Sequence, residues 1–130
     1  MVLIKKAKPL SLIFLFIFLL NCISTKRNCK DFHTGDFYTE TIVNGIKYKS
    51  TFSRDNSGIQ IEEFEGKIDS SYVRWVNECE MILSPINPKK MSEKKNIFIK
   101  ILTTNDTSYT YEYSFLGQTN KLKAEAIKIR

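Results

Sequence analysis

The side chains best suited to catalysis or metal binding are few in this 130-residue chain and form no recognisable pattern. His33, the only histidine, follows Cys29 by four residues, a spacing that could supply two metal ligands. No complementary pair exists elsewhere in the sequence, so a loop histidine beside a disulfide is the preferred interpretation. A carboxylate pair among Glu62, Glu63 and Glu65 could do acid–base work, but exposed acids on a solvated strand edge are the commoner case. The sequence has no glycine-rich phosphate loop and no serine nucleophile elbow, so it predicts no enzyme, no metal and no cofactor.

Aromatic side chains offer a binding chemistry instead. Tyr109, Tyr111 and Tyr113 alternate along one strand and therefore share a face. They could pack against neighbouring strands, line a ligand cavity with apolar walls and orienting hydroxyls, or stack on exposed bases. Packing is preferred, and cavity lining is second. Trp75, the single tryptophan, is predicted to anchor the core, with a cavity wall as the alternative. These four residues are the candidate ligand-binding side chains.

The N-terminus predicts export. Three lysines among the first eight residues precede an apolar run over residues 10–20. That run is shorter than the roughly 20 residues needed to cross a bilayer, so residues 1–21 are predicted to be a helical signal peptide. The sequence Leu19-Leu20-Asn21-Cys22 resembles a bacterial lipobox, whose cysteine is acylated, with palmitate among the acyl chains. Cys22 is therefore the predicted lipidation site, and ordinary secretion with cleavage nearby is the alternative.

The remaining chain is predicted to hold one domain. Residues 22–34 are expected to form a tether and N-terminal lead-in, and residues 35–130 a single β domain. The segment 23–28 has no acidic residue, which favours a periplasm-facing attachment to the cell envelope and leaves inner or outer membrane open. Without its three signal-peptide lysines the chain has 20 − 3 = 17 basic and 14 acidic residues. Interleaved charges with a net +3 do not favour a nucleic-acid partner.

The cysteine count predicts a disulfide. Acylation of Cys22 leaves Cys29 and Cys79 as an even pair in an oxidising compartment. A bridge between them would close a 79 − 29 = 50-residue loop. The alternative is two unpaired thiols, with Cys79 a small core residue.

Hydrophobic residues recur with a period of two from Gly35 onward, which indicates β-strands. Asn44 and Gly45, between β-rich runs over 37–43 and 46–52, predict a type I′ hairpin. Further strands are expected over 59–64, with a bulge between Ile61 and Phe64, and over 72–83, 97–102, 109–115 and 122–129. About seven strands, with turns about every ten residues, predict an all-β antiparallel meander that closes into a small barrel or sandwich.

A charged loop interrupts this pattern. Its basic and acidic residues are Lys89, Lys90, Glu93, Lys94 and Lys95. A solvated loop is the preferred interpretation, and a patch for lipid head groups or a partner is the alternative.

Three motifs carry a family resemblance. They are Cys29-x-Asp-Phe-x-Thr-Gly35, Gln60-Ile61-Glu62, and Trp75-x-x-x-Cys79-Glu80, with Arg54 between the first two. The chain resembles a family of small, uncharacterised Gram-negative envelope lipoproteins over nearly its whole mature length. Members often carry the label "DNA topoisomerase IV", which is erroneous for a chain of this size, because a topoisomerase subunit needs an ATPase or DNA-cleavage domain many times larger. The Thr-Gly before a strand and the Trp-x-x-x-Cys strand are also similar to lipocalin-like β-barrels, which implies a cupped barrel with a ligand mouth.

These observations predict a lipid-anchored envelope protein that binds and does not catalyse. Acyl chains would attach it to the membrane, and a lipocalin-like β domain would hold a small apolar ligand. The alternative is an accessory or structural lipoprotein that contacts an envelope partner through its surface.

Overall fold

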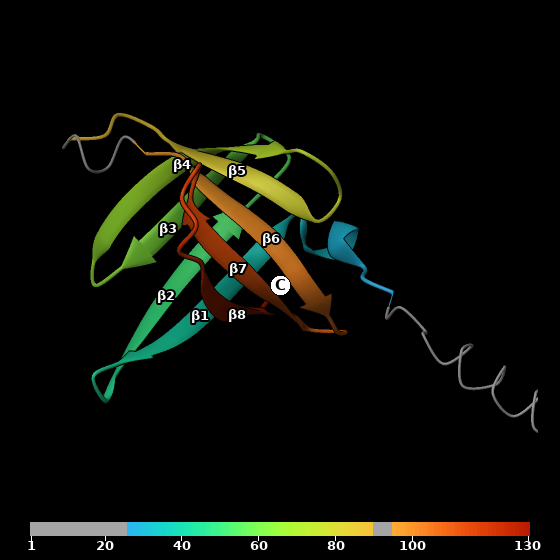
Figure 1. Ribbon diagram of the computed structural model, residues 1–130, viewed down its shortest axis with the longest axis horizontal. Coiled ribbons are helices and arrows are strands. Elements are labelled where there is room, and N and C mark those ends of the chain that lie inside the picture. Colours follow the sequence, from blue (N-terminus) through green and yellow to red (C-terminus); the bar gives the residue numbers. More distant parts are fainter. Residues whose placement is uncertain (1–25, 90–94) are drawn as a thin grey trace, which may run out of the picture.

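The computed structural model describes residues 26–89 and 95–130, which form a closed antiparallel barrel (Figure 1). Each strand pairs with the next, and β8 returns to pair with β1. The elements are η1 (Cys29–Phe32), β1 (Gly35–Val43), β2 (Ile46–Arg54), β3 (Ile59–Phe64), β4 (Lys67–Trp75), β5 (Glu80–Pro85), β6 (Ile97–Thr104), β7 (Ser108–Phe115) and β8 (Leu122–Lys128). The predicted all-β class and closing meander are confirmed, and the architecture is that of a small lipocalin-like barrel. The predicted signal peptide, Cys22 and most of the charged loop lie outside the described residues.

The barrel has eight strands because the long strand predicted over 72–83 is two strands. β4 ends at Trp75 and β5 begins at Glu80. Between them Asn77 accepts a hydrogen bond at 2.9 Å from the backbone N–H of Cys79. Side-chain capping of this kind is how Asn stabilises a turn.

The predicted hairpin at Asn44 and Gly45 is confirmed. Both residues have positive φ, 53° and 77°, as a type I′ turn requires. Glu65 and Gly66 repeat the arrangement between β3 and β4, with φ of 49° and 78°.

The predicted bulge in β3 is wrong. β3 pairs in unbroken register with both neighbours, from Ile59 to Phe64 against β4 and from Gln60 to Phe64 against β2. The register shift of the barrel lies instead in β6, between Ile101 and Thr103.

The two ends of the barrel differ. The β1–β2, β3–β4, β5–β6 and β7–β8 connections meet at one end, which we call the mouth. η1 covers the other, plugged end, where Cys29 and Phe32 are each 1% exposed. The larger core cluster gathers beneath η1 and consists of Cys29, Phe32, Phe37, Phe52, Ile101, Tyr109 and Ala126. A smaller one on β5 and β6 consists of Met81, Leu83 and Ile99.

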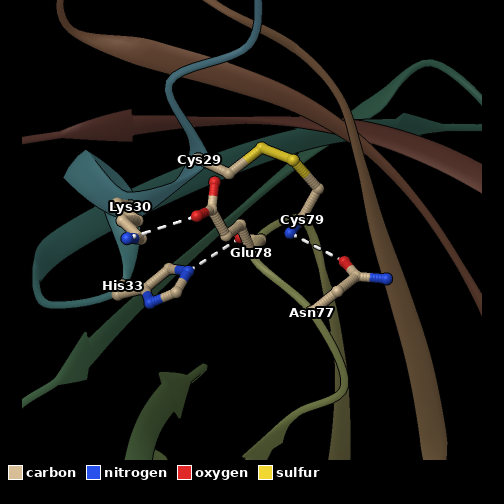
Figure 2. A network of polar contacts seen from close by, with 6 residues as sticks. All are labelled: Cys29, Lys30, His33, Asn77, Glu78 and Cys79. Atoms are coloured by element: carbon tan, nitrogen blue, oxygen red, sulfur yellow. Dashed lines mark hydrogen bonds and ion pairs between the residues drawn. A yellow bond between two sulfur atoms is a disulfide. The ribbon is translucent and has the colours of Figure 1, made fainter.

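The predicted Cys29–Cys79 disulfide is confirmed and ties η1 to the β4–β5 turn (Figure 2). Beside it the His33 ring stacks on Trp75 with centroids 3.7 Å apart. His33 Nε2 donates to the Glu78 carbonyl at 2.7 Å, since a carbonyl only accepts. The plug is therefore held by a covalent bond, a ring stack and a hydrogen bond, and His33 is the loop histidine that the sequence predicted.

Candidate ligand-binding cavity

A cavity of about 260 Å³ lies inside the barrel, between the plugged end and the mouth. Inward-facing residues of seven strands line it, because alternate side chains of each strand point into the barrel. Its apolar wall comprises Phe52, Leu83, Ile97, Ile99 and Ala124. Its polar lining comprises Thr39, Thr41, Ser50, Arg54, Gln60 and Glu62.

The three predicted tyrosines of β7 complete the cavity wall. Tyr109, Tyr111 and Tyr113 run from the floor toward the mouth, with successive ring centroids 5.4 and 5.8 Å apart. Burial raises the pKa of the Tyr109 and Tyr111 phenols above its ordinary value of 10.0. The tyrosine stripe thus packs across the barrel at its lower end and lines the cavity above, combining two of the roles weighed from the sequence.

Trp75, the fourth predicted residue, does not line this cavity. It borders a separate hollow of about 190 Å³ at the plugged end, together with His33. Its indole packs against both core clusters, in agreement with a core anchor.

Arg54 forms the floor of the cavity although it is only 4% exposed. Its Nη2 donates to the Phe32 carbonyl at 2.6 Å and to the Tyr109 hydroxyl at 3.1 Å. Its Nη1 donates to Gln60 Oε1 at 3.0 Å, and its Nε to the His33 carbonyl at 3.3 Å. One guanidinium therefore connects the plug to the cavity.

The charge of Arg54 is buried without a carboxylate. No ion pair joins it to an acidic residue in residues 26–89 or 95–130. Aromatic faces surround it instead, with the guanidinium carbon 4.7 Å from the Phe37 ring centroid, 5.3 Å from Phe52 and 5.8 Å from Trp75. Cation–π attraction and carbonyl dipoles hold the charge in place.

Glu62 points into the cavity and is not the exposed acid that the sequence suggested. It pairs across β3 and β4 with Asp69. Burial, and secondarily the charge of Asp69, raise the pKa of the Glu62 carboxyl above its ordinary value of 4.5, while the Ser50 hydroxyl opposes the shift. Glu63 and Glu65 are exposed, as expected. His33 is not among the residues that line the cavity, so Glu62 and His33 do not converge in one cleft.

A hydroxyl without a partner lies in the same wall. Thr39 Oγ1 is buried and makes no hydrogen bond within the described chain. It lies near the Tyr111 phenol, whose pKa it lowers against the larger effect of burial. Thr39 therefore places a hydroxyl beside Tyr111 in the cavity wall.

Toward the mouth the cavity adjoins a larger hollow of about 710 Å³, and Gln60, Glu62, Leu83 and Ile97 border both. The barrel also loosens there, because β1 and β8 pair at only three positions, from Phe37 to Thr39 of β1. The cavity thus has Arg54 as its floor, beneath η1, and continues toward the mouth into the larger hollow.

The sequence assigned no role to Arg54, and it weighed Glu62 only as an acid–base group or an exposed edge acid. Arg54 could have been found as a charged residue on the face of β2 that carries Tyr48 and Phe52. Glu62 gives no such signal, because its neighbours Ile61 and Glu63 make either face of β3 plausible.

No group of three or more His, Cys, Asp or Glu side chains is placed to bind a metal ion in the described part of the chain. Within those same residues, no helix has the length and apolar character needed to span a membrane. The sequence matches no protein-family model, and neither the curated proteins nor the solved structures contain a match.

Proposed function

We propose that this protein binds a small, largely apolar molecule in the barrel cavity while acyl chains on Cys22 hold it at the cell envelope. The observation that carries the proposal is an internal cavity walled by Tyr109, Tyr111 and Tyr113, plugged at one end and continuous at the other with the hollow toward the mouth. Apolar walls with a few placed polar groups are typical of small-molecule sites.

The size of the cavity limits the ligand. Its volume of about 260 Å³ lies just below the roughly 300–1,000 Å³ of common ligand sites. A small molecule would fill it, and a longer one would extend into the hollow at the mouth.

The start of the described chain bears on how an anchored barrel would be oriented. The Arg27 guanidinium donates to the Ile101 carbonyl at 2.8 Å, and the Asn28 N–H to Thr104 Oγ1 at 2.8 Å, so the chain leaves at the plugged end (Figure 1). The 27 − 22 = 5 residues back to Cys22 span at most about 18 Å. An acylated Cys22 would therefore keep the plugged end near its bilayer and direct the mouth toward the aqueous compartment.

The ligand is tested by native mass spectrometry of the chain purified from its own envelope. A retained small molecule is expected in the wild type. Ala124→Phe should exclude it by filling the cavity, whereas Glu125→Phe, on the exposed face of the same strand, should retain it. No retained mass in the wild type, or equal retention in both variants, would contradict the proposal.

The anchor is tested separately by growing cells with a palmitate analogue. Labelling of the wild type and loss of label in Cys22→Ser, with release from the membrane fraction, are expected. An unlabelled wild type that stays membrane-bound in both cases would exclude acylation.

A second candidate function, docking of an envelope partner, is favoured by the β1–β2 hairpin. The part of this hairpin nearest its turn lies beyond the residues where β1 pairs with β8 and β2 pairs with β3, so in that part each strand pairs only with the other. At its tip Ile42 is 71% and Ile46 56% exposed. If the hairpin docks a partner, Ile42→Ser with Ile46→Ser should abolish cross-linking from this tip and leave ligand retention unchanged.

A further inference from the structure

The hydrogen-bond donors at the cavity floor outnumber their acceptors. A guanidinium has five N–H groups, and four of those on Arg54 are used by Phe32, His33, Gln60 and Tyr109. The fifth, on Nη1, has no acceptor in the described residues.

The two cavity-side partners of Arg54 are oriented as donors. Gln60 Oε1 accepts from Arg54, so its NH₂ group is left to donate elsewhere. The Tyr109 oxygen also accepts from Arg54, so its own hydrogen is free for another acceptor. Both residues line the cavity, and neither side chain donates to a group within residues 26–89 and 95–130.

Aromatic rings and carbonyl dipoles stabilise the buried Arg54 charge, and a negatively charged acceptor at the unused donors would stabilise it further. A charge-assisted hydrogen bond is stronger than a neutral one. We infer that the floor formed by Arg54, Gln60 and Tyr109 is a carboxylate-binding site for an amphiphile whose apolar tail lies along the tyrosine wall toward the mouth. The inference rests on the proposed function and specifies its ligand class: a monocarboxylate that enters head first.

Glu62 is the one acidic residue that lines the same cavity. It follows Gln60 by two residues on β3, which places it about 6.6 Å nearer the mouth. At that position it would lie beside the upper part of the ligand and not beside its head group. Its ionised form would oppose the bound carboxylate, so the site favours a Glu62 that keeps its proton.

The test compares decanoate with decanol, which share a tail and differ in the head group. The full chain is reconstituted in phosphatidylcholine vesicles, and each ligand is titrated at neutral pH while the emission of Trp75, the only tryptophan, is recorded. The Trp75 ring lies 5.8 Å from the Arg54 guanidinium, so it reports on the floor. Decanoate should bind about 10- to 100-fold more tightly than decanol, the range expected for a hydrogen-bonded charge. Equal affinities would overturn the carboxylate site and leave the cavity proposal standing, whereas binding of neither would overturn both.

Two substitutions of one residue identify the site. Gln60→Glu places a carboxylate beside Arg54 and should abolish the preference for decanoate while decanol still binds. Gln60→Met removes the amide without adding charge and should keep most of that preference. A preference unchanged in Gln60→Glu would overturn the assignment to Arg54. Circular dichroism checks folding, and if Gln60→Glu does not fold, the wild-type comparison of the two ligands decides alone.

Discussion

The Cys29–Cys79 disulfide is expected to supply a large share of the stability of this domain. It joins two cysteines that are 50 residues apart in the sequence. For a loop of that length the chain-entropy model gives a stabilisation of about 4 kcal/mol. Whole domains of this size are commonly stable by only about 5–15 kcal/mol. The bridge also fixes η1, whose Cys29 and Phe32 side chains belong to the larger core cluster.

The perturbation is Cys29→Ala with Cys79→Ala, followed by thermal unfolding monitored by circular dichroism. At roughly 4–8 °C per kcal/mol for a domain near 100 residues, the midpoint should fall by about 15–30 °C. Reduction of the wild type should produce a similar fall. Reduction of the double variant, which has no bridge to lose, should cause none and is the control.

A fall of less than about 5 °C in the double variant would refute this reasoning. It would mean that the unfolded chain gains little freedom when the bridge is absent. The hydrogen bonds from Arg54 to the Phe32 and His33 carbonyls would then be sufficient to keep η1 in place.

Three further predictions concern single residues. Tyr109→Phe should lower the free energy of unfolding, measured in urea, by about 1–2 kcal/mol, because it leaves a buried guanidinium N–H of Arg54 without its acceptor. Tyr113→Phe is the control and should change that free energy little, because the Tyr113 hydroxyl has no hydrogen bond in the described chain. Burial raises the pKa of Glu62 in the folded state, so folding favours the protonated carboxyl and stability declines as pH rises through that pKa. Glu62→Gln should accordingly be more stable than the wild type at neutral pH, and the difference should disappear below the ordinary pKa of 4.5; an advantage that persisted in acid would contradict the assignment. Gly35→Ala should destabilise the protein more than Gly45→Ala, because the Cβ added at Gly35 would lie 2.7 Å from the backbone oxygen of Arg130. The Cβ added at Gly45 meets nothing within 4 Å and adds only the cost of positive φ, about 1–2 kcal/mol. Equal losses in thermal unfolding would refute the contact.

The features of the fold that could be predicted are those with local causes. The Asn44-Gly45 turn follows from the conformational freedom of two adjacent residues, and the inward faces of β2 and β7 follow from alternation. The sequence did not decide whether the strands form a barrel or a sandwich. Closure into a barrel depends on the pairing of Phe37 to Thr39 with Ala126 to Lys128. These segments lie about 90 residues apart, and no local pattern records their contact.

The turn between β4 and β5, which the predicted strand over 72–83 missed, has a physical explanation. Trp75 and Met81 face each other across the hairpin. Residues 76–80 separate them, so the even spacing of inward positions continues through the turn. A strand that turns back in this way has the same alternation as one that runs straight on, and only Asn77 marked the difference.

The inward charges were missed for a related reason. On β3 the inward set includes Gln60 and Glu62, whereas Ile61 faces outward and is 48% exposed. Judged by polarity alone, Ile61 would face inward, and Gln60 and Glu62 would face the solvent. The pairing of Phe52 with Glu62 sets the register, and it is a tertiary contact that outweighs the preference of each residue.

The position of Arg54 links the stability of the plug to the occupancy of the cavity. The same guanidinium donates to Phe32 and His33 in the plug and to Gln60 and Tyr109 in the cavity. Because its donors lie in one plane and one of them is unused, a carboxylate could accept from it without displacing the other four. Such a ligand would reduce the cost of keeping the charge buried beneath η1, so ligand and plug should stabilise each other. Decanoate should then raise the unfolding midpoint more than decanol does, and removal of the disulfide should weaken decanoate binding; an affinity unaffected by that removal would show that the floor forms independently of η1.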